Sequence, residues 1–274
     1  MARARRHGPA RGAPGAAGRR GGGSAAAADG ATVWIFGLHA VRDALVNPAR
    51  VRRRLILTPN AAERLAEVLP QAGLAPEIAD PRRFPAPLDP QSVHQGAALE
   101  VLPLDWGPLS ELCAPRGRRA RVVLLDRVSD PHNAGAILRS AEVFGALAVI
   151  APSRHSAPET GALAKAASGA LERQPYLRVR NLAQAMAELR GMGYRLIGLD
   201  GAAEATLGEA LSQAAAGPVA LVLGAEGAGL RQLTRESCDM LARIAPSGPF
   251  GSLNVSNAAA VALYAARAAQ EGAA

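Results

Sequence analysis

The chain has 274 residues, which is enough for one large domain or two small ones, and its hydrophobic content of 49% can supply a core. Aromatic residues make up only 3%, so this core must rely on Leu, Val, Ile and Ala. A net charge of +8 favours an acidic partner such as nucleic acid. Residues 1–30 carry +5 of this charge through six arginines and Asp29, so the remainder is only mildly basic.

The composition also argues against membrane, secreted and metal-binding proteins. No apolar run approaches the roughly 18 residues that span a bilayer, and the N-terminus lacks the hydrophobic core of a secretory signal. Cys113 and Cys238 lie far apart and match no metal or redox spacing, which favours two reduced thiols. We therefore expect a soluble, cytoplasmic protein that holds no metal.

The first part of the chain divides into a tail and a small unit. Residues 1–30 are rich in Gly, Ala, Arg and Pro without periodicity, which predicts a disordered basic tail that either adds loose affinity for RNA or is dispensable. Residues 31–104 predict a small α/β unit. Its expected helices cover 38–46 and 61–69, and its expected strands cover 54–57 and 97–104. Residues 105–120, with Pro, Gly and an arginine cluster, indicate a linker.

From residue 121 to 274, apolar strand runs alternate with helical patterns, which predicts a parallel sheet covered on both faces. Ligands of such sheets lie beyond the C-terminal ends of the strands. The expected strands are 122–125, 147–151, 177–180, 195–199, 219–223 and 241–245. The expected helices are 134–144, 182–189, 207–215, 230–237 and 255–269.

The loop after the first of these strands, within residues 124–145, combines an amide with an arginine. Asn133 is a good helix N-cap, and Arg139 can reach back toward it because helical side chains lean toward the N-terminus. A guanidinium and an amide at a strand end make a site for an anionic or sugar-phosphate ligand. An ordinary strand–turn–helix with a solvated arginine is the alternative.

Two later loops add glycines and polar groups. Residues 219–230 place Glu226 among glycines in the order G-x-x-G-x-G, which matches neither the dinucleotide fingerprint nor a P-loop. Residues 244–257 place Ser252 and Asn254 near the start of a predicted helix. The hydroxyl and amide side chains there are more numerous than a single helix N-cap requires. Caps and solvated polar residues are the alternative for this third loop.

Together the three loops resemble a known family. The segments DPHNAGAILRSAEVFGA, LVLGAEGAGL and IAPSGPFGSLNVSNAAA are similar to the three motifs of the SpoU/TrmH family of RNA ribose 2′-O-methyltransferases, in the SPOUT class. FGLHAVRDAL (residues 36–45) and HQGAALEVLPL (residues 94–104) resemble the ribosomal-protein-like RNA substrate-binding domain found in this family. In detail the resemblance is to the branch that methylates a guanosine ribose in 23S rRNA.

The resemblance implies a SPOUT-type α/β fold in which the C-terminal segment of residues 121–274 forms a trefoil knot. It implies S-adenosylmethionine as the cofactor and structured RNA, 23S rRNA in this branch, as the partner. It also implies a homodimer that completes each active site across its interface. The residues that it assigns to the cofactor are Leu223, Gly224, Ala225, Ile244 and Leu253.

The family assignment of the catalytic centre is Arg139, Asn133, Glu226, Ser252 and Asn254. An arginine general base is unfavourable because a guanidinium has a pKa above about 12. We therefore expect Arg139 to bind an adjacent phosphate and to stabilise developing charge, while Ser252 and Asn254 orient the ribose and solvent takes the proton.

Weaker candidates and other functions stay open. His132 is a weaker candidate for the base, and the RNA-binding candidates Arg154, Lys165 and Ser168 could equally be solvated. The alternative functions are a tRNA ribose 2′-O-methyltransferase and a non-catalytic RNA-binding ribosome-assembly factor. The five catalytic candidates argue against a protein that only binds RNA.

Overall fold

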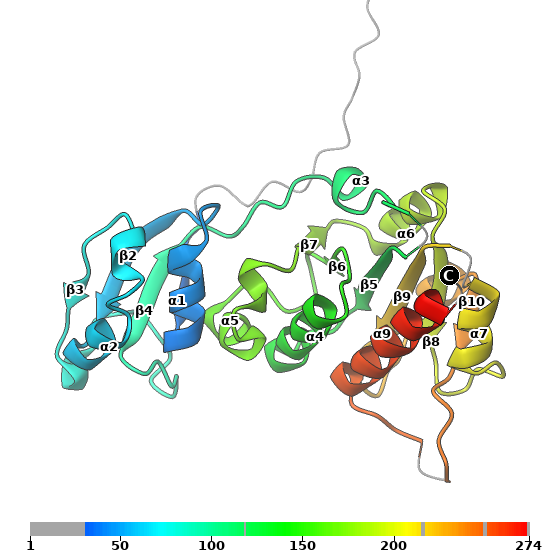
Figure 1. The fold of residues 1–274 in the computed structure, drawn as a ribbon. Coiled ribbons are helices and arrows are strands. Elements are labelled where there is room, and N and C mark those ends of the chain that lie inside the picture. Colours follow the sequence, from blue (N-terminus) through cyan, green and yellow to red (C-terminus); the bar gives the residue numbers. More distant parts are fainter. Residues whose placement is uncertain (1–30, 118, 215–216, 249–250, 273–274) are drawn as a thin grey trace, which may run out of the picture.

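The computed structural model describes residues 31–117, 119–214, 217–248 and 251–272, so the predicted tail at residues 1–30 lies outside the described part. In that part the chain forms two α/β units side by side (Figure 1). None of the helices in these residues has the length and the apolar character needed to cross a membrane.

The N-terminal unit contains, among the described residues, a four-stranded sheet in the order β1-β4-β2-β3. Strand β4 runs antiparallel to both β1 and β2. Helix α1 has the predicted bounds, whereas α2 ends before the predicted residue 69. The elements are β1 (Val33–Phe36), α1 (Leu38–Val46), β2 (Arg52–Leu57), α2 (Pro59–Arg64), β3 (Glu77–Ile78) and β4 (Ala97–Val101).

The C-terminal unit confirms the predicted α/β fold with a parallel sheet. Its described strands pair in the order β10-β8-β9-β5-β6-β7, and every pairing is parallel. The strands are β5 (Arg121–Asp126), β6 (Val149–Pro152), β7 (Tyr176–Val179), β8 (Arg195–Leu199), β9 (Val219–Gly224) and β10 (Met240–Ala242). The helices are α3 (Leu109–Leu112), α4 (Pro131–Val143), α5 (Gly161–Ala167), α6 (Leu182–Gly191), α7 (Leu207–Ala214), α8 (Gln232–Glu236) and α9 (Val255–Gly272).

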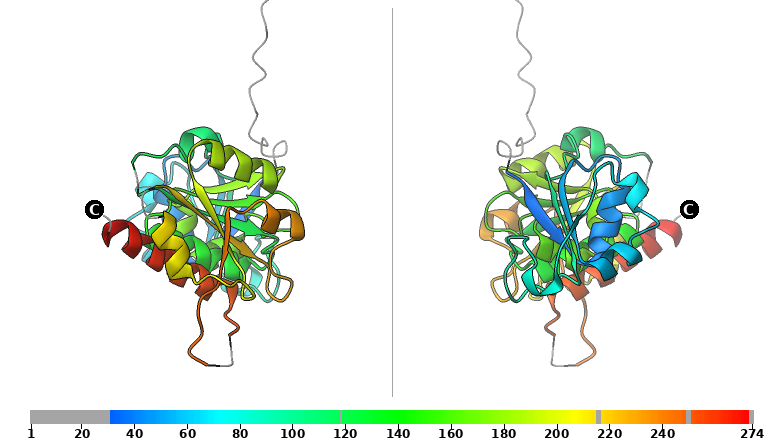
Figure 2. Two further views of the ribbon diagram at one scale, coloured as in Figure 1. Left: turned by 90° about the vertical axis from the view of Figure 1, so that its right-hand side faces the viewer. Right: turned by 90° about the vertical axis from the view of Figure 1, so that its left-hand side faces the viewer.

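Helices cover both faces of this sheet, so its strands are continuously apolar rather than alternating (Figure 2). Val123 and Leu125 of β5 pack in the core formed with α4, α7 and α9. Val122 and Leu124 pack on the other side with α3 and α6. The arms of the loop between β10 and α9 project from the body of the unit (Figures 1 and 2).

Helix α5, which the sequence pattern did not predict, joins the two units. It lies between α4 and the N-terminal sheet, and Gly161 at its start faces Phe36 and the carbonyl of Trp34. A Cβ at Gly161 would lie 2.3 Å from the Phe36 ring, so the close approach requires glycine. As a result one hydrophobic core runs through both units.

The segment interpreted as a linker, residues 105–120, carries α3 and packs on the six-stranded sheet. Leu109 and Cys113 belong to the core on the α6 side, and the Tyr194 hydroxyl donates to the Cys113 carbonyl at 2.8 Å. Burial raises the pKa of the Cys113 thiol to about 12. This segment therefore contributes to the core of the C-terminal unit.

Candidate functional site

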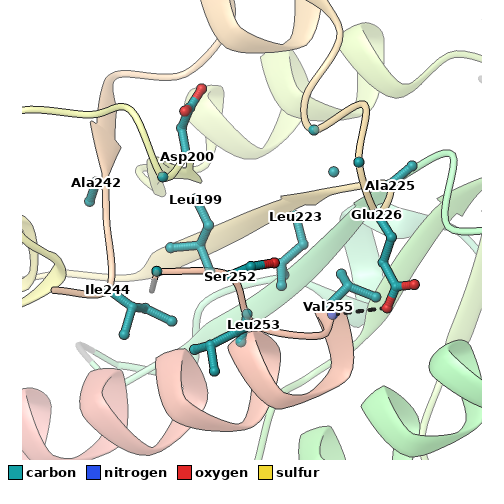
Figure 3. A pocket seen from close by; sticks show the side chains of 16 residues that line it. Leu199, Asp200, Leu223, Ala225, Glu226, Ala242, Ile244, Ser252, Leu253 and Val255 are labelled. Atoms are coloured by element: carbon teal, nitrogen blue, oxygen red, sulfur yellow. Dashed lines mark hydrogen bonds between the residues drawn. The ribbon is translucent and has the colours of Figure 1, made fainter. Parts of the chain in front are cut away.

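A cavity of about 310 Å³ opens at the C-terminal edge of the six-stranded sheet (Figure 3). The segments that follow β8, β9 and β10 meet there with the start of α9. Every residue expected to contact a cofactor lines the cavity, namely Leu223, Gly224, Ala225, Ile244 and Leu253. Glu226 and Ser252 of the catalytic candidates line it as well.

Glu226 is the centre of a polar cluster beside this cavity. Its Oε1 accepts hydrogen bonds from Asn133 Nδ2 at 3.2 Å, from Asn254 Nδ2, and from the backbone N–H of Val255 at 3.4 Å. Figure 3 shows the Glu226 carboxylate pointing at the first turn of α9. A carboxylate is favourable there, because the N-terminus of a helix carries partial positive charge.

Asn254 links the cluster to α9. Its Oδ1 accepts from the backbone N–H groups of Ser256 at 2.8 Å and Asn257 at 3.4 Å, which caps the helix. Its Nδ2 donates to Glu226 and to Asn133 Oδ1, the latter at 2.9 Å. The first and third loops, 121 residues apart, therefore meet through an amide pair.

The start of α4 corrects one prediction. The N-cap is Asp130, which accepts from the His132 N–H at 2.9 Å, and Pro131 occupies the first helical position. Proline suits this position because its φ angle is already helical and it has no N–H to satisfy. Asn133 therefore lies within the first turn, which frees its side chain for Glu226 and Asn254.

Arg139 does not reach this cluster, so the expectation that it folds back to Asn133 is wrong within one chain. Six positions turn a helix by about 600° and bring the side chain to another face. Arg139 is exposed and lies in a shallow cavity of α4 with Ser140, Val143 and Phe144. In the part of the chain that the structure describes, it has no hydrogen bond or ion pair.

The first cavity suits a small amphipathic cofactor. The side chains of Leu199, Leu223 and Ile244 give it apolar walls, and polar side chains are few, as is typical of cofactor sites of about 300–1,000 Å³. A Cβ at Gly224 would lie 2.1 Å from the carbonyl carbon of Gly229, so the loop after β9 can lie against the strand only because residue 224 is glycine.

The sequence did not predict that the segment after β8 forms one side of the first cavity. Leu199, Asp200 and Gly201 line the cavity, and Asp200 forms an ion pair with Arg235 at 2.8 Å. A single acidic residue after a strand gives little signal by itself. The rule that ligands lie at the C-terminal strand edge was the signal that could have found it.

The remaining candidates lie elsewhere. Lys165 donates to the carbonyl of Val93 at 3.1 Å and so contacts the N-terminal unit. Ser168 ends α5 in a left-handed conformation, and Arg154 and His132 are exposed. Among the described residues no group of three or more His, Cys, Asp or Glu side chains could hold a metal ion.

Comparison with known proteins identifies the class. The sequence model of the SpoU rRNA Methylase family matches residues 120–264, and the chain belongs to this family. It is 38% identical over 240 residues to the 23S rRNA (guanosine-2′-O-)-methyltransferase RlmB of Pseudomonas putida, covering 85% of this chain and 94% of that protein. It is 40% identical to the protein of the same name from Xanthomonas campestris, covering 85% and 95% of the two chains.

Solved structures share the fold. The SpoU methyltransferase AviRb of Streptomyces viridochromogenes superposes with a TM-score of 0.73 at 22% identity, covering 88% of this chain and 91% of that chain. An AdoMet-bound rRNA methyltransferase from Sinorhizobium meliloti gives a TM-score of 0.69 at 25% identity, covering 86% and 87%.

Proposed function

We propose that this protein transfers a methyl group from S-adenosylmethionine to the ribose 2′-oxygen of a guanosine in 23S rRNA. The observation that carries the proposal is the meeting of the cofactor-sized cavity with the cluster of Asn133, Glu226 and Asn254 at one sheet edge. Relatives named as 23S rRNA guanosine-2′-O-methyltransferases, at 38–40% identity over 85% of the chain, support the substrate.

The residues present fit the cofactor. The glycine cradle at Gly224 and the apolar side chains of Leu199, Leu223 and Ile244 suit an adenosyl group held by backbone contacts. The solved rRNA methyltransferase of S. meliloti is described as AdoMet bound. When bound, S-adenosylmethionine supplies a methyl group activated by its positively charged sulfur.

Glu226 is the group that orients the nucleophile. Its Oε1 is engaged by three donors, which fixes the carboxylate, while its Oε2 has no partner among the described residues. The free Oε2 can accept a hydrogen bond from a ribose 2′-hydroxyl and hold the oxygen at the cavity, while the proton released on methylation passes to solvent. Ser252, exposed at the same cavity, offers a second contact for the ribose.

Asn254 acts through Glu226 in this account. Its amide nitrogen and oxygen both bond within the chain, so it positions the carboxylate instead of contacting the ribose as first expected. Asn133 keeps one amide hydrogen beyond its bond to Glu226 and remains able to contact the substrate.

Arg139 completes the site of a second copy in a homodimer. The support is its exposure outside its own cluster, together with apolar side chains on the neighbouring surface of α4 and α9. Val143 is 67% exposed and Tyr264 is 64% exposed, and the Tyr264 ring contacts the Phe144 ring with centroids 6.0 Å apart. Exposed apolar side chains gathered in this way are typical of interfaces.

We also propose that residues 31–104 bind the RNA substrate and that residues 121–274 form the catalytic domain, with a C-terminal trefoil knot. The protein would act in the cytoplasm, where bacterial rRNA is found. The knot is supported by the chain path: after β10 at the sheet edge, α9 returns to pack on α4 and β9.

Two measurements test the proposed function. Titration calorimetry should detect binding of S-adenosylmethionine and no binding of NAD, and absence of the first would reject the methyltransferase. Mapping of ribose methylation in cells with and without the gene should lose one guanosine in 23S rRNA. Loss from tRNA instead would reassign the substrate, and loss of no methyl group would favour an assembly factor.

A further inference from the structure

A second cavity, of about 320 Å³, lies on the other side of the loop that follows β9. It shares Ala225 and Gly229 with the first cavity, so one loop separates the two. Its polar side chains come from the loops after β5, β6 and β9, and they are Arg127, Ser129, His155 and Arg231. Of these, only Arg231 has a side-chain partner among the described residues.

Arg231 is held in place by a buried carboxylate. Asp126, the last residue of β5, has no exposed surface and accepts from Arg231 Nε at 2.7 Å and from the Arg231 backbone N–H at 2.9 Å. The Arg231 side chain is 51% exposed, so its terminal guanidinium nitrogens remain open to a ligand. A fixed guanidinium is a preorganised donor for an anion.

Arg127 and His155 extend the polar lining of this cavity. Both are non-glycine residues with a left-handed backbone, at φ 63° and φ 61°, a conformation that favours glycine. The Arg127 charge is uncompensated in the described part of the chain, and the Ser129 hydroxyl beside it is a further donor. The two acids close to Arg127 in the sequence do not line the cavity: Asp126 is paired with Arg231, and Asp130 caps α4.

We propose that this second cavity binds a phosphodiester group of the RNA, next to the nucleotide whose ribose lies at Glu226. The inference rests on the proposed function and adds the place where the backbone is held. Two guanidinium groups, an imidazole and a hydroxyl are donors that suit a phosphate, and phosphate contacts fix the register of a nucleic acid. The loop after β9, which lines both cavities, would separate this phosphate from the cofactor.

Arg127→Gly is the informative variant, because glycine adopts φ 63° without strain while the charge is removed. Arg231 is unsuitable, since its loss would leave the buried Asp126 unpaired. The matched control is Arg195→Ala, which removes an exposed arginine without a side-chain partner in the described residues, from the opposite edge of the same sheet. Arg127→Lys tests whether charge alone is sufficient.

The experiment measures equilibrium binding of a labelled, unmodified 23S rRNA transcript at several salt concentrations, together with S-adenosylmethionine binding. Arg127→Gly should weaken RNA binding about tenfold and make the slope of log K against log salt less steep by about 0.7–1, with cofactor affinity unchanged. Arg127→Lys should retain the wild-type slope, and Arg195→Ala should match the wild-type protein in every measurement.

The proposal would be overturned if Arg127→Gly bound RNA with the same affinity and the same salt dependence as the wild-type protein. It would also be overturned if Arg127→Gly weakened cofactor binding and left RNA binding unchanged. RNA binding is measured without turnover, so it reports on the second cavity independently of catalysis. A wild-type protein that binds RNA but transfers no methyl group would contradict the proposed function. The salt dependence of RNA binding by Arg127→Gly would still test the phosphate site.

Discussion

Arg50 and Glu172 form a bidentate ion pair across the boundary between the two units. Arg50 Nη2 lies 2.7 Å from Glu172 Oε1, and Nε lies 3.0 Å from Oε2, with side chains 0% and 3% exposed. Arg50 also binds Glu159 and the carbonyl of Leu102, and Asn47 Nδ2 donates to Glu172 at 2.9 Å. The two units are therefore docked through buried charge as well as through the shared core.

Removal of Arg50 should destabilise the protein strongly. Burial raises the pKa of Glu159 even though the nearby Arg50 charge lowers it. Arg50→Met would leave Glu159 and Glu172 buried without their counterion. We expect the free energy of unfolding to fall by about 3–5 kcal/mol in urea denaturation. Adding Glu172→Gln should recover part of this loss.

Arg54→Met is the matched control for this prediction, because Arg54 pairs with Glu77 on the exposed surface. It should change the stability little, since exposed ion pairs contribute little. Equal effects of Arg50→Met and Arg54→Met would show that the buried pair does not hold the units together.

Gly224→Ala should abolish cofactor binding while the protein remains folded. The added Cβ would lie 2.1–2.4 Å from the backbone of Gly229 and Leu230, so the loop after β9 must move away from the strand. Calorimetry should detect at least a hundredfold loss of S-adenosylmethionine affinity, which corresponds to about 2.7 kcal/mol. Gly208→Ala, which meets open space in α7, should bind as the wild type does.

Both thiols should be unreactive in the native protein. Burial raises the pKa of Cys113 and of Cys238 to about 12, whereas an unfolded thiol titrates near 8.5. The folded state thus keeps protons that the unfolded state loses. The resulting stability is complete below about pH 8.5 and is lost as the pH rises toward 12.

A disulfide reagent at pH 8 should therefore react more than about 100-fold more slowly with the native protein than with the protein in urea. Stability measured between pH 8 and pH 11 should fall, and Cys113→Ala should reduce this fall. Native thiols as reactive as unfolded ones would contradict the buried placement of Cys113 in the core beside α6.

Mixed dimers test whether Arg139 acts across an interface. Arg139→Ala and Glu226→Gln homodimers should each lose at least about 90% of kcat, because each lacks one part of every site. A heterodimer of the two variants, purified by two different tags, would have one intact site if Arg139 serves the partner. It should regain about half of the wild-type activity.

Two results oppose this arrangement. If Arg139 serves its own chain, neither site of the heterodimer is intact and no activity returns. If the protein is a monomer in sedimentation, the arginine cannot act in trans at all.

Much of the fold follows from local pattern. Strand β8 and helix α1 have their predicted bounds because apolar periodicity and flanking polar or glycine residues mark both ends. Glycines after a buried strand also predicted a close backbone approach in the loop after β9, and the structure shows one between Gly224 and Gly229. Helix α5 was missed because its small, mostly alanine residues carry little periodic signal.

Contacts between distant segments were beyond sequence reasoning. The sequence pattern predicts Asn133 as the N-cap of α4, but Asp130 occupies that position. The side chain of Asn133 instead bonds to Glu226 and Asn254, which lie 93 and 121 residues away. The pairing of Arg50 with Glu172 spans 122 residues. The first set of contacts depends on how the loops of the C-terminal unit meet at the sheet edge, and the second depends on how the two units pack. No local sequence pattern specifies either arrangement.

The most direct test of the central claim is methyl transfer to RNA by the wild-type protein and by Glu226→Gln. The proteins are incubated with isotope-labelled S-adenosylmethionine and unmodified 23S rRNA, and the RNA is digested for nucleoside mass spectrometry. We predict labelled 2′-O-methylguanosine at one position with the wild type and less than about a tenth of that rate with Glu226→Gln, at similar cofactor affinity. Label on a base, no label, or full activity in Glu226→Gln would contradict the account.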